Sequence, residues 1–188
     1  MMTHAVLPTL PLLDENSVLP AAAEQLATTK KAMGFVPNMY GYMANLPAVF
    51  STYNAGYAAF RSEAGFSSVE QEVVFLAISR ANGCDYCTAA HSMVADKMSG
   101  VPADVLQSLR SGTPISDPRL DALARFAFGM TETRGKVDPS LMDDFLSAGF
   151  TQEHVLAVVL AISVKTLSNY TNHLAETPLD AAFSDYAV

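Results

Sequence analysis

Hydrophobic positions recur at a helical period along nearly the whole chain. Residues 47–65 show the pattern, with apolar side chains at spacings of three and four. No segment shows the strict alternation that is typical of a strand. We therefore expect an all-α, single-domain helical bundle with short connections. The pattern predicts helices over residues 20–34, 47–65, 67–83, about 84–100, 102–112, 117–135 and 138–149, with two more beginning at residue 151 and at about residue 168.

Several of these helices have a clear start signal. Ser67 and Glu70 form the spacing of a capping box, in which each side chain bonds the other residue's backbone N–H. Asp117 and Asp138 are each followed by proline, and this order predicts an N-cap followed by the first helical position.

One stretch of the pattern occurs twice. Residues 66–91 align without gaps on residues 150–175, and seven of the 26 positions are identical, including the block LAIS. We interpret this as a degenerate duplication of a helix pair. The second copy has Ser168, Thr171, Leu156 and Ala175 where the first has Cys84, Cys87, Glu72 and His91. This contrast places a candidate site in the first copy alone.

Composition narrows the possible partners and surroundings. Half of the 188 residues are apolar, so we expect one folded domain over residues 21–188 with an N-terminal tail over residues 1–20. A formal net charge of −8 argues against binding nucleic acid or an anionic membrane surface. The longest apolar run, residues 155–164, is shorter than the roughly 20 residues of a membrane span.

The N-terminal segment lacks the basic region of a signal peptide, so we expect a cytoplasmic location. A lasting structural disulfide is disfavoured there, and a Cys-x-x-Cys pair more often binds metal or does redox chemistry.

The chain's two cysteines share a helix face with a histidine. Cys84 and Cys87 are three residues apart, and His91 is four beyond Cys87. A helix N-terminus favours the thiolate form of a cysteine. His91 is placed to take a proton from Cys87 or to stabilise its thiolate.

Glu72 lies on the preceding predicted helix. If the chain reverses near residues 82–83, a simple hairpin places Glu72 within a turn of His91. The carboxylate would then orient the imidazole. The alternative, which spacing alone leaves equally open, is a glutamate at the edge of a helix face with its head group in water.

Other interpretations of the cysteine pair need weighing. Haem attachment requires histidine directly after the second cysteine, where this chain has Thr88. Zinc could be held by Cys84, Cys87 and His91, with a fourth ligand from Glu72 or His173. Two buried, inert thiols are a further alternative. We favour a redox dithiol with no metal or other cofactor.

The pattern Glu-x11-Cys-x2-Cys-x3-His resembles the signature of the alkyl hydroperoxidase D-like (carboxymuconolactone decarboxylase) superfamily. Residues 34–50 are similar to the segment that precedes this motif in the peroxidase-related branch, and the decarboxylase-like core would span about residues 45–130. The resemblance implies an all-helical fold, a homo-oligomer such as a trimer or hexamer, and thiol-dependent peroxide reduction.

Carried over by motif, Cys87 is the peroxidatic cysteine and Cys84 the resolving one. The resemblance makes His91 the proton acceptor and Glu72 the far end of the relay. The best-studied members have histidine before the second cysteine, where this chain has Tyr86. Tyr86 is a possible relay member through its hydroxyl, or a packing residue.

These observations and the resemblance predict a thiol peroxidase or disulfide reductase. The peroxidase would reduce a hydroperoxide at the expense of an external dithiol, such as a thioredoxin-like or lipoyl reductant. Two alternatives stay open. One is a decarboxylase acting on a lactone acid, which would need no cysteine pair. The other is a non-enzymatic zinc or redox-sensing module.

Overall fold

The structure is a computed structural model that describes residues 6–7, 9–18 and 20–188. Within these residues the regular structure is helical and contains no strand, which confirms the all-α fold. The α-helices are α1 (Pro20–Met33), α2 (Asn38–Met43), α3 (Pro47–Glu63), α4 (Ser68–Ala81), α5 (Asp85–Val94), α6 (Ala103–Ser111), α7 (Pro118–Glu132), α8 (Pro139–Ser147) and α9 (Gln152–Ala175). A short π-helix, η1 (Ala95–Ser99), extends α5, and a 3₁₀ helix, η2 (Ala181–Tyr186), lies near the C-terminus.

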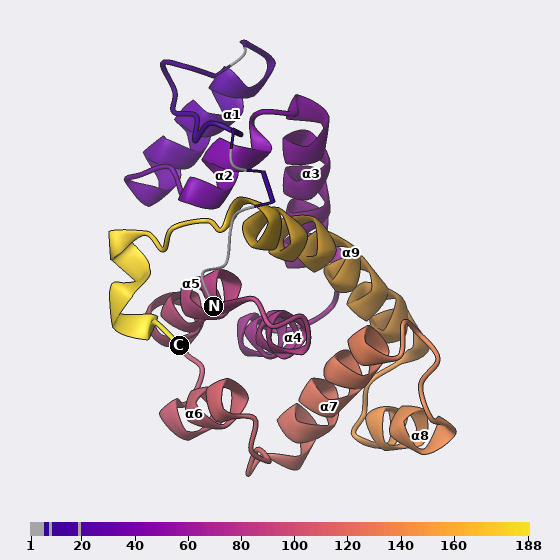
Figure 1. Cartoon of the computed structure of the whole chain (residues 1–188). Coiled ribbons are helices and arrows are strands. Elements are labelled where there is room, and N and C mark those ends of the chain that lie inside the picture. Colours follow the sequence, from indigo (N-terminus) through magenta and orange to yellow (C-terminus); the bar gives the residue numbers. More distant parts are fainter. Residues whose placement is uncertain (1–5, 8, 19) are drawn as a thin grey trace.

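Helix α4 forms the centre of the bundle. Every residue from Glu70 to Ser79 is buried, because α4 packs against α5, α7 and α9 together (Figure 1). A helix that is covered on all sides belongs to the core rather than the surface. Helix α3 crosses α9, and η2 packs on α5, so the C-terminal segment lies beside the cysteine helix (Figure 1).

The predicted helix starts are confirmed by their hydrogen bonds. The Ser67 hydroxyl accepts from the backbone N–H of Glu70, and the Glu70 carboxylate accepts from that of Ser67. Asp117 and Asp138 each accept a backbone N–H two residues on. These bonds satisfy donors that an isolated helix end leaves unpaired.

The prediction of a separate helix from about Ser168 is wrong. Helix α9 runs without interruption for 24 residues and passes through Ser168. The first copy turns at Gly83, whose φ of +65° is easy only for glycine. The second copy has Leu167 at the aligned position, so nothing in its sequence stops the helix. Helices α2 and η2 were not predicted.

Part of the predicted N-terminal tail lies against the domain. The backbone N–H of Leu13 donates to Gly41, and that of Leu7 donates to Leu174. Residues 1–5, 8 and 19 of this tail lie outside the described residues. In the described part of the chain, no single helix is long and apolar enough to cross a membrane. Helices α8 and α9 have that length and hydropathy only as a pair, and the pair is bent by 114°.

Candidate active site

The two cysteines lie where α5 begins. Cys84 is the N-cap residue in an extended conformation, and Cys87 lies in the first turn. Both are free thiols and both are buried, with 1% and 3% of their surface exposed. The N-terminal end of a helix carries partial positive charge, so the local backbone favours a thiolate here.

The hairpin brings Glu72 and His91 together. Glu72 Oε2 lies 2.8 Å from His91 Nδ1, and Glu72 is fully buried. The head group therefore does not reach into water, which was one of the two arrangements that spacing allowed. Burial on its own would raise the pKa of Glu72, but His91 and Arg61 together hold this pKa below its ordinary value.

Arg61 of α3 is the second partner of Glu72. Its Nη2 lies 2.5 Å from Glu72 Oε1, at an angle that makes an ion pair rather than a hydrogen bond. The same guanidinium donates to Tyr57 and Gln71 and lies over the Phe75 ring, 4.9 Å from its centroid. Arg61 thus lies at the Oε1 oxygen of Glu72, while His91 contacts Oε2.

His91 is buried against the Phe75 ring, with 4.7 Å between the ring centroids. Burial and the charge of Lys165 lower its pKa, and they outweigh the opposite effect of Glu72. The imidazole is thus neutral near pH 7. With a carboxylate at Nδ1, the proton resides on that nitrogen and Nε2 is left as an acceptor. His91 can therefore act as a base.

Helix α9 supplies polar groups to the same place. Lys165, Ser168 and Asn172 lie on one face of α9 at spacings of three and four, and all are buried. Asn172 Nδ2 donates to Cys87 Sγ at 3.2 Å and lies 3.9 Å from Cys84 Sγ. The amide thus contacts both sulfur atoms and is closer to Cys87.

The two thiols are electrostatically different. Burial raises the pKa of Cys87, but a hydrogen bond from Cys84 and the charge of Lys165 bring it well below the ordinary value. The same hydrogen bond, together with burial, raises the pKa of Cys84. Cys87 is therefore the sulfur that ionises first.

A cavity of about 130 Å³ opens beside Cys87. His91 and Lys165 also line it, so the thiol, a base and a cation share one small space. The rest of the wall is mostly aromatic and apolar, and it includes Met39, Tyr40, Tyr53, Tyr57, Tyr86 and Phe183. Burial raises the pKa values of these four tyrosines first of all, which keeps their hydroxyls protonated.

Tyr86 connects the cysteine motif to the C-terminal segment. Its hydroxyl donates to Asp180 and accepts from the backbone N–H of Met39 at 3.4 Å. Its ring meets Phe183 of η2 edge to face. The hydroxyl thus donates one hydrogen bond and accepts another, and neither involves His91.

Residues 47–128 match the sequence model of the carboxymuconolactone decarboxylase family, and this stretch contains Glu72, both cysteines and His91. Residues 47–128 thus match this family in sequence, and the whole chain has the alkyl hydroperoxidase D-like fold. Members of this superfamily are enzymes. No curated protein matches the chain at a significant level.

Solved structures share this alkyl hydroperoxidase D-like fold. A peroxidase-related protein with an alkylhydroperoxidase AhpD core, from Ralstonia eutropha JMP134, superposes with a TM-score of 0.80 at 22% identity over 92% of each chain. One from Silicibacter sp. TM1040 gives 0.78 at 20% identity over 97% of each chain. The debrominase Bmp8, as a cysteine-to-alanine variant bound to 2,3,4-tribromopyrrole, gives 0.79 at 16% identity, with 98% of this chain and 96% of that chain covered.

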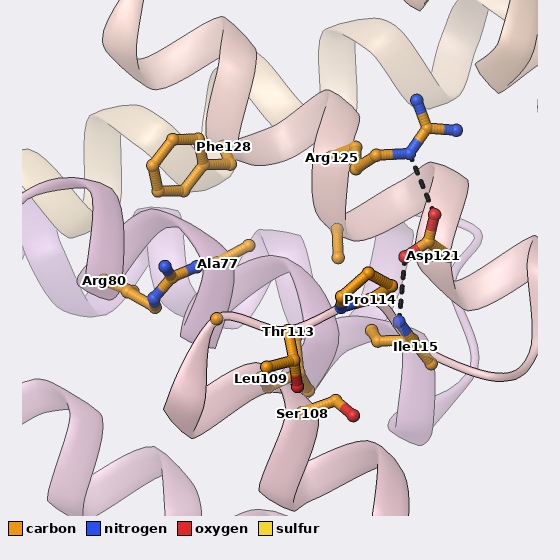
Figure 2. Close-up of a pocket in the computed structure, with 12 residues that line it drawn as sticks. Ala77, Arg80, Ser108, Leu109, Thr113, Pro114, Ile115, Asp121, Arg125 and Phe128 are labelled. Atoms are coloured by element: carbon orange, nitrogen blue, oxygen red, sulfur yellow. Dashed lines mark hydrogen bonds and ion pairs between the residues drawn. The ribbon is translucent and has the colours of Figure 1, made fainter.

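A larger cavity, of about 380 Å³, lies between α4, α6 and α7 of this alkyl hydroperoxidase D-like domain (Figure 2). The Asp121 carboxylate there accepts from Arg125 and from the backbone N–H of Ile115. No cysteine or histidine lines this cavity, so the chemistry that the motif predicts belongs to the smaller one. In the part of the chain that the structure describes, no group of three or more His, Cys, Asp or Glu side chains is arranged to hold a metal ion.

Sequence reasoning missed Arg61, Lys165, Asn172 and Asp180. One signal was available. Lys165 is the only Lys, Arg, Asp or Glu residue between Glu153 and Glu176, and it directly follows the apolar run of residues 155–164. A lysine at the end of such a run can mark a buried charge with a specific partner.

Proposed function

We propose that the chain is a thiol-dependent peroxidase that reduces hydroperoxides through Cys84 and Cys87. The observation that carries this proposal is a buried Cys87 with an Asn172 donor at its sulfur, in a cavity shared with a neutral histidine. The match to the alkyl hydroperoxidase D-like superfamily supports it. A decarboxylase would leave this dithiol without a role.

In the first step His91 accepts the proton of the Cys87 thiol, which leaves a thiolate, and His91 returns to its neutral form when this proton moves on. The thiolate attacks the outer oxygen of the hydroperoxide and the O–O bond breaks. Cys87 becomes a sulfenic acid, and the leaving alkoxide receives the proton and departs as an alcohol. Glu72 acts through His91, since it holds the ring orientation and the Nδ1 proton.

In the second step the Cys84 sulfur attacks Cys87. Water leaves and a Cys84–Cys87 disulfide forms. An external dithiol then reduces this disulfide by exchange and becomes a disulfide itself. In sum, one hydroperoxide and one external dithiol yield one alcohol, one water and one oxidised reductant.

The test is peroxide consumption by the purified protein with a panel of dithiols that includes a lipoyl compound and a thioredoxin-like protein. We expect turnover with at least one reductant, and a count of two free thiols that falls to zero after one equivalent of peroxide. Two unchanged thiols after peroxide treatment would exclude the redox proposal.

Reductive dehalogenation is a second candidate. The fold shared with debrominase Bmp8 and the aromatic wall formed by Tyr40, Tyr53 and Tyr57 favour a flat halogenated ring as substrate. The ring carbon would gain a proton, the halogen would leave as halide, and the two thiols would become a disulfide. Bromide release from a bromopyrrole in the presence of dithiol, without peroxide turnover, distinguishes this candidate.

We also propose a cytoplasmic homo-oligomer, a trimer or a hexamer. Large apolar side chains on α9 are exposed, with Leu156 at 71% and Tyr170 at 56%. Exposed large apolar side chains of this kind favour association with another copy. Light scattering at micromolar concentration tests this, and a 20.1 kDa particle would contradict it.

A further inference from the structure

Lys165 is an unusual residue for a protein interior. It is 1% exposed, and it has no hydrogen-bond acceptor or ion-pair partner among the residues that the structure describes. Its ammonium lies 5.6 Å from the centroid of the Phe75 ring and lines the cavity beside Cys87. A buried ammonium without a counter-ion is strongly unfavourable, so the site favours a negative charge near it.

The acidic groups around this cavity leave one candidate for that charge. Glu72 of α4 already serves His91 of α5 and Arg61 of α3. Asp180 accepts hydrogen bonds from the Tyr86 hydroxyl and from the backbone N–H of Asn38. The remaining titratable groups of the wall are Tyr40 of α2, Tyr53 and Tyr57 of α3, Tyr86 of α5, and Cys87. Since the tyrosines stay protonated, Cys87 is the available anion.

A second group on α9 acts on the same atom. Asn172 follows Lys165 by two helical turns on the same face, and its amide is 0.7 Å closer to Cys87 Sγ than to Cys84 Sγ, at 3.2 Å against 3.9 Å. A hydrogen bond to a charged acceptor is roughly twice as strong as a neutral one. The amide therefore favours negative charge on Cys87 over Cys84.

We propose that Lys165 is the counter-ion of a Cys87 thiolate and that Asn172 directs ionisation to Cys87 rather than Cys84. Both are positioning residues supplied by α9, outside the cysteine motif. The lowered pKa of Cys87 and the raised pKa of Cys84 agree with this assignment. The inference rests on the proposed function only in taking Cys87 as the attacking sulfur.

The test measures thiolate formation directly, without peroxide. In a Cys84→Ser background, where the serine hydroxyl can still donate to Cys87, the iodoacetamide alkylation rate is followed from about pH 5 to pH 10. Lys165→Met keeps the length and removes the charge. We expect the Cys87 pKa to rise and alkylation near pH 7 to slow by about tenfold or more, since one pKa unit is a factor of ten.

Three further variants separate charge from packing. Lys165→Arg is expected to keep most of the rate near pH 7. Asn172→Ala is expected to slow it less than Lys165→Met, by several-fold, as one hydrogen bond is lost. Lys136→Met removes an exposed lysine and serves as the control with an unchanged profile.

Two results would overturn the inference. One is an ordinary thiol pKa for Cys87 in the Cys84→Ser protein, which requires no Lys165 variant to fold. The other is an unchanged profile in a Lys165→Met protein whose circular dichroism is native. A protein that consumes no peroxide but has a low, lysine-dependent Cys87 pKa would instead contradict the proposed function and leave this inference standing.

Discussion

The two copies of the repeated pattern have the same apolar face but different backbones. Residues 66–91 form two helices joined by a tight turn at Gly83. Residues 150–175 lie almost entirely in one helix, α9. The block LAIS is identical in both. The turn of the first copy depends on Gly83. The second copy has Leu167 at the aligned position, and its helix continues.

This difference divides the chemistry between the copies. The break creates a helix N-terminus at Cys84 and folds α5 back so that His91 meets Glu72. The unbroken copy has no such end, but its continuous face brings Asn172 to the sulfur atoms and Lys165 to the cavity beside Cys87. The second copy of the pattern thus lacks the reactive groups and still contributes polar side chains to the site from α9.

The largest expected effect comes from removing the reactive sulfur. Cys87→Ser should abolish peroxide reduction, and Cys84→Ser should react once and stop at a sulfenic acid on Cys87. Dimedone labelling and peptide mapping of the single variants check the order. Thr171→Ser, at the position in α9 aligned with Cys87, is the matched control with unchanged turnover. A label on Cys84 alone would reverse the assignment.

The second largest effect is expected when the proton relay of His91 and Glu72 is removed. His91→Ala should slow the first step by about 10²–10⁴-fold, the usual range for a positioned base. Glu72→Gln should slow it less, because the carboxylate acts through the ring. Stopped-flow measurement of the first turnover compares them. A larger loss in Glu72→Gln than in His91→Ala would contradict this order of action.

The turn itself gives a smaller effect, on stability. Gly83→Ala should cost about 1–2 kcal/mol, because a side chain is strained at positive φ. No atom lies within 4 Å of the added Cβ, so the cost is that of the backbone alone. At the aligned position in α9, glycine should be less stable than alanine. Leu167→Gly should unfold more easily than Leu167→Ala by about 1 kcal/mol. Urea unfolding of the unchanged protein and of these three variants measures both differences in unfolding free energy.

The smallest effect is expected at Tyr86. Tyr86→Phe removes the hydroxyl that binds Asp180, at a cost of about 1 kcal/mol in unfolding free energy. Its first-turnover rate should fall far less than that of His91→Ala. A loss equal to that of His91→Ala would instead place the tyrosine hydroxyl in the proton relay.

Local signals in the sequence predicted most of the fold. Ser67, Asp117 and Asp138 are caps whose partners lie within three residues, so their role can be inferred without tertiary structure. The approach of Glu72 to His91 also follows from one tight turn. The repeat predicts the same break in both copies, but the second copy lacks the glycine, and α9 is therefore continuous.

The rest of the site depends on packing between distant segments. Arg61 reaches Glu72 only because α3 packs beside α4, and Asn172 meets a sulfur 85 residues earlier. No spacing rule relates such positions. Asp180 belongs to a C-terminal segment whose place on α5 is set by its contacts there and not by a periodic pattern.

The buried lysine has a consequence for the reduction step. With Cys87 as a thiolate, the charges of Arg61, Lys165, Glu72 and Cys87 around a neutral His91 sum to zero. Disulfide formation removes one negative charge and leaves Lys165 uncompensated in an apolar wall, which raises the free energy of the oxidised state. The disulfide should therefore be readily reduced. The incoming reductant attacks as a thiolate, and when Cys87 is the sulfur that it displaces, the Cys87 thiolate restores the missing charge beside Lys165.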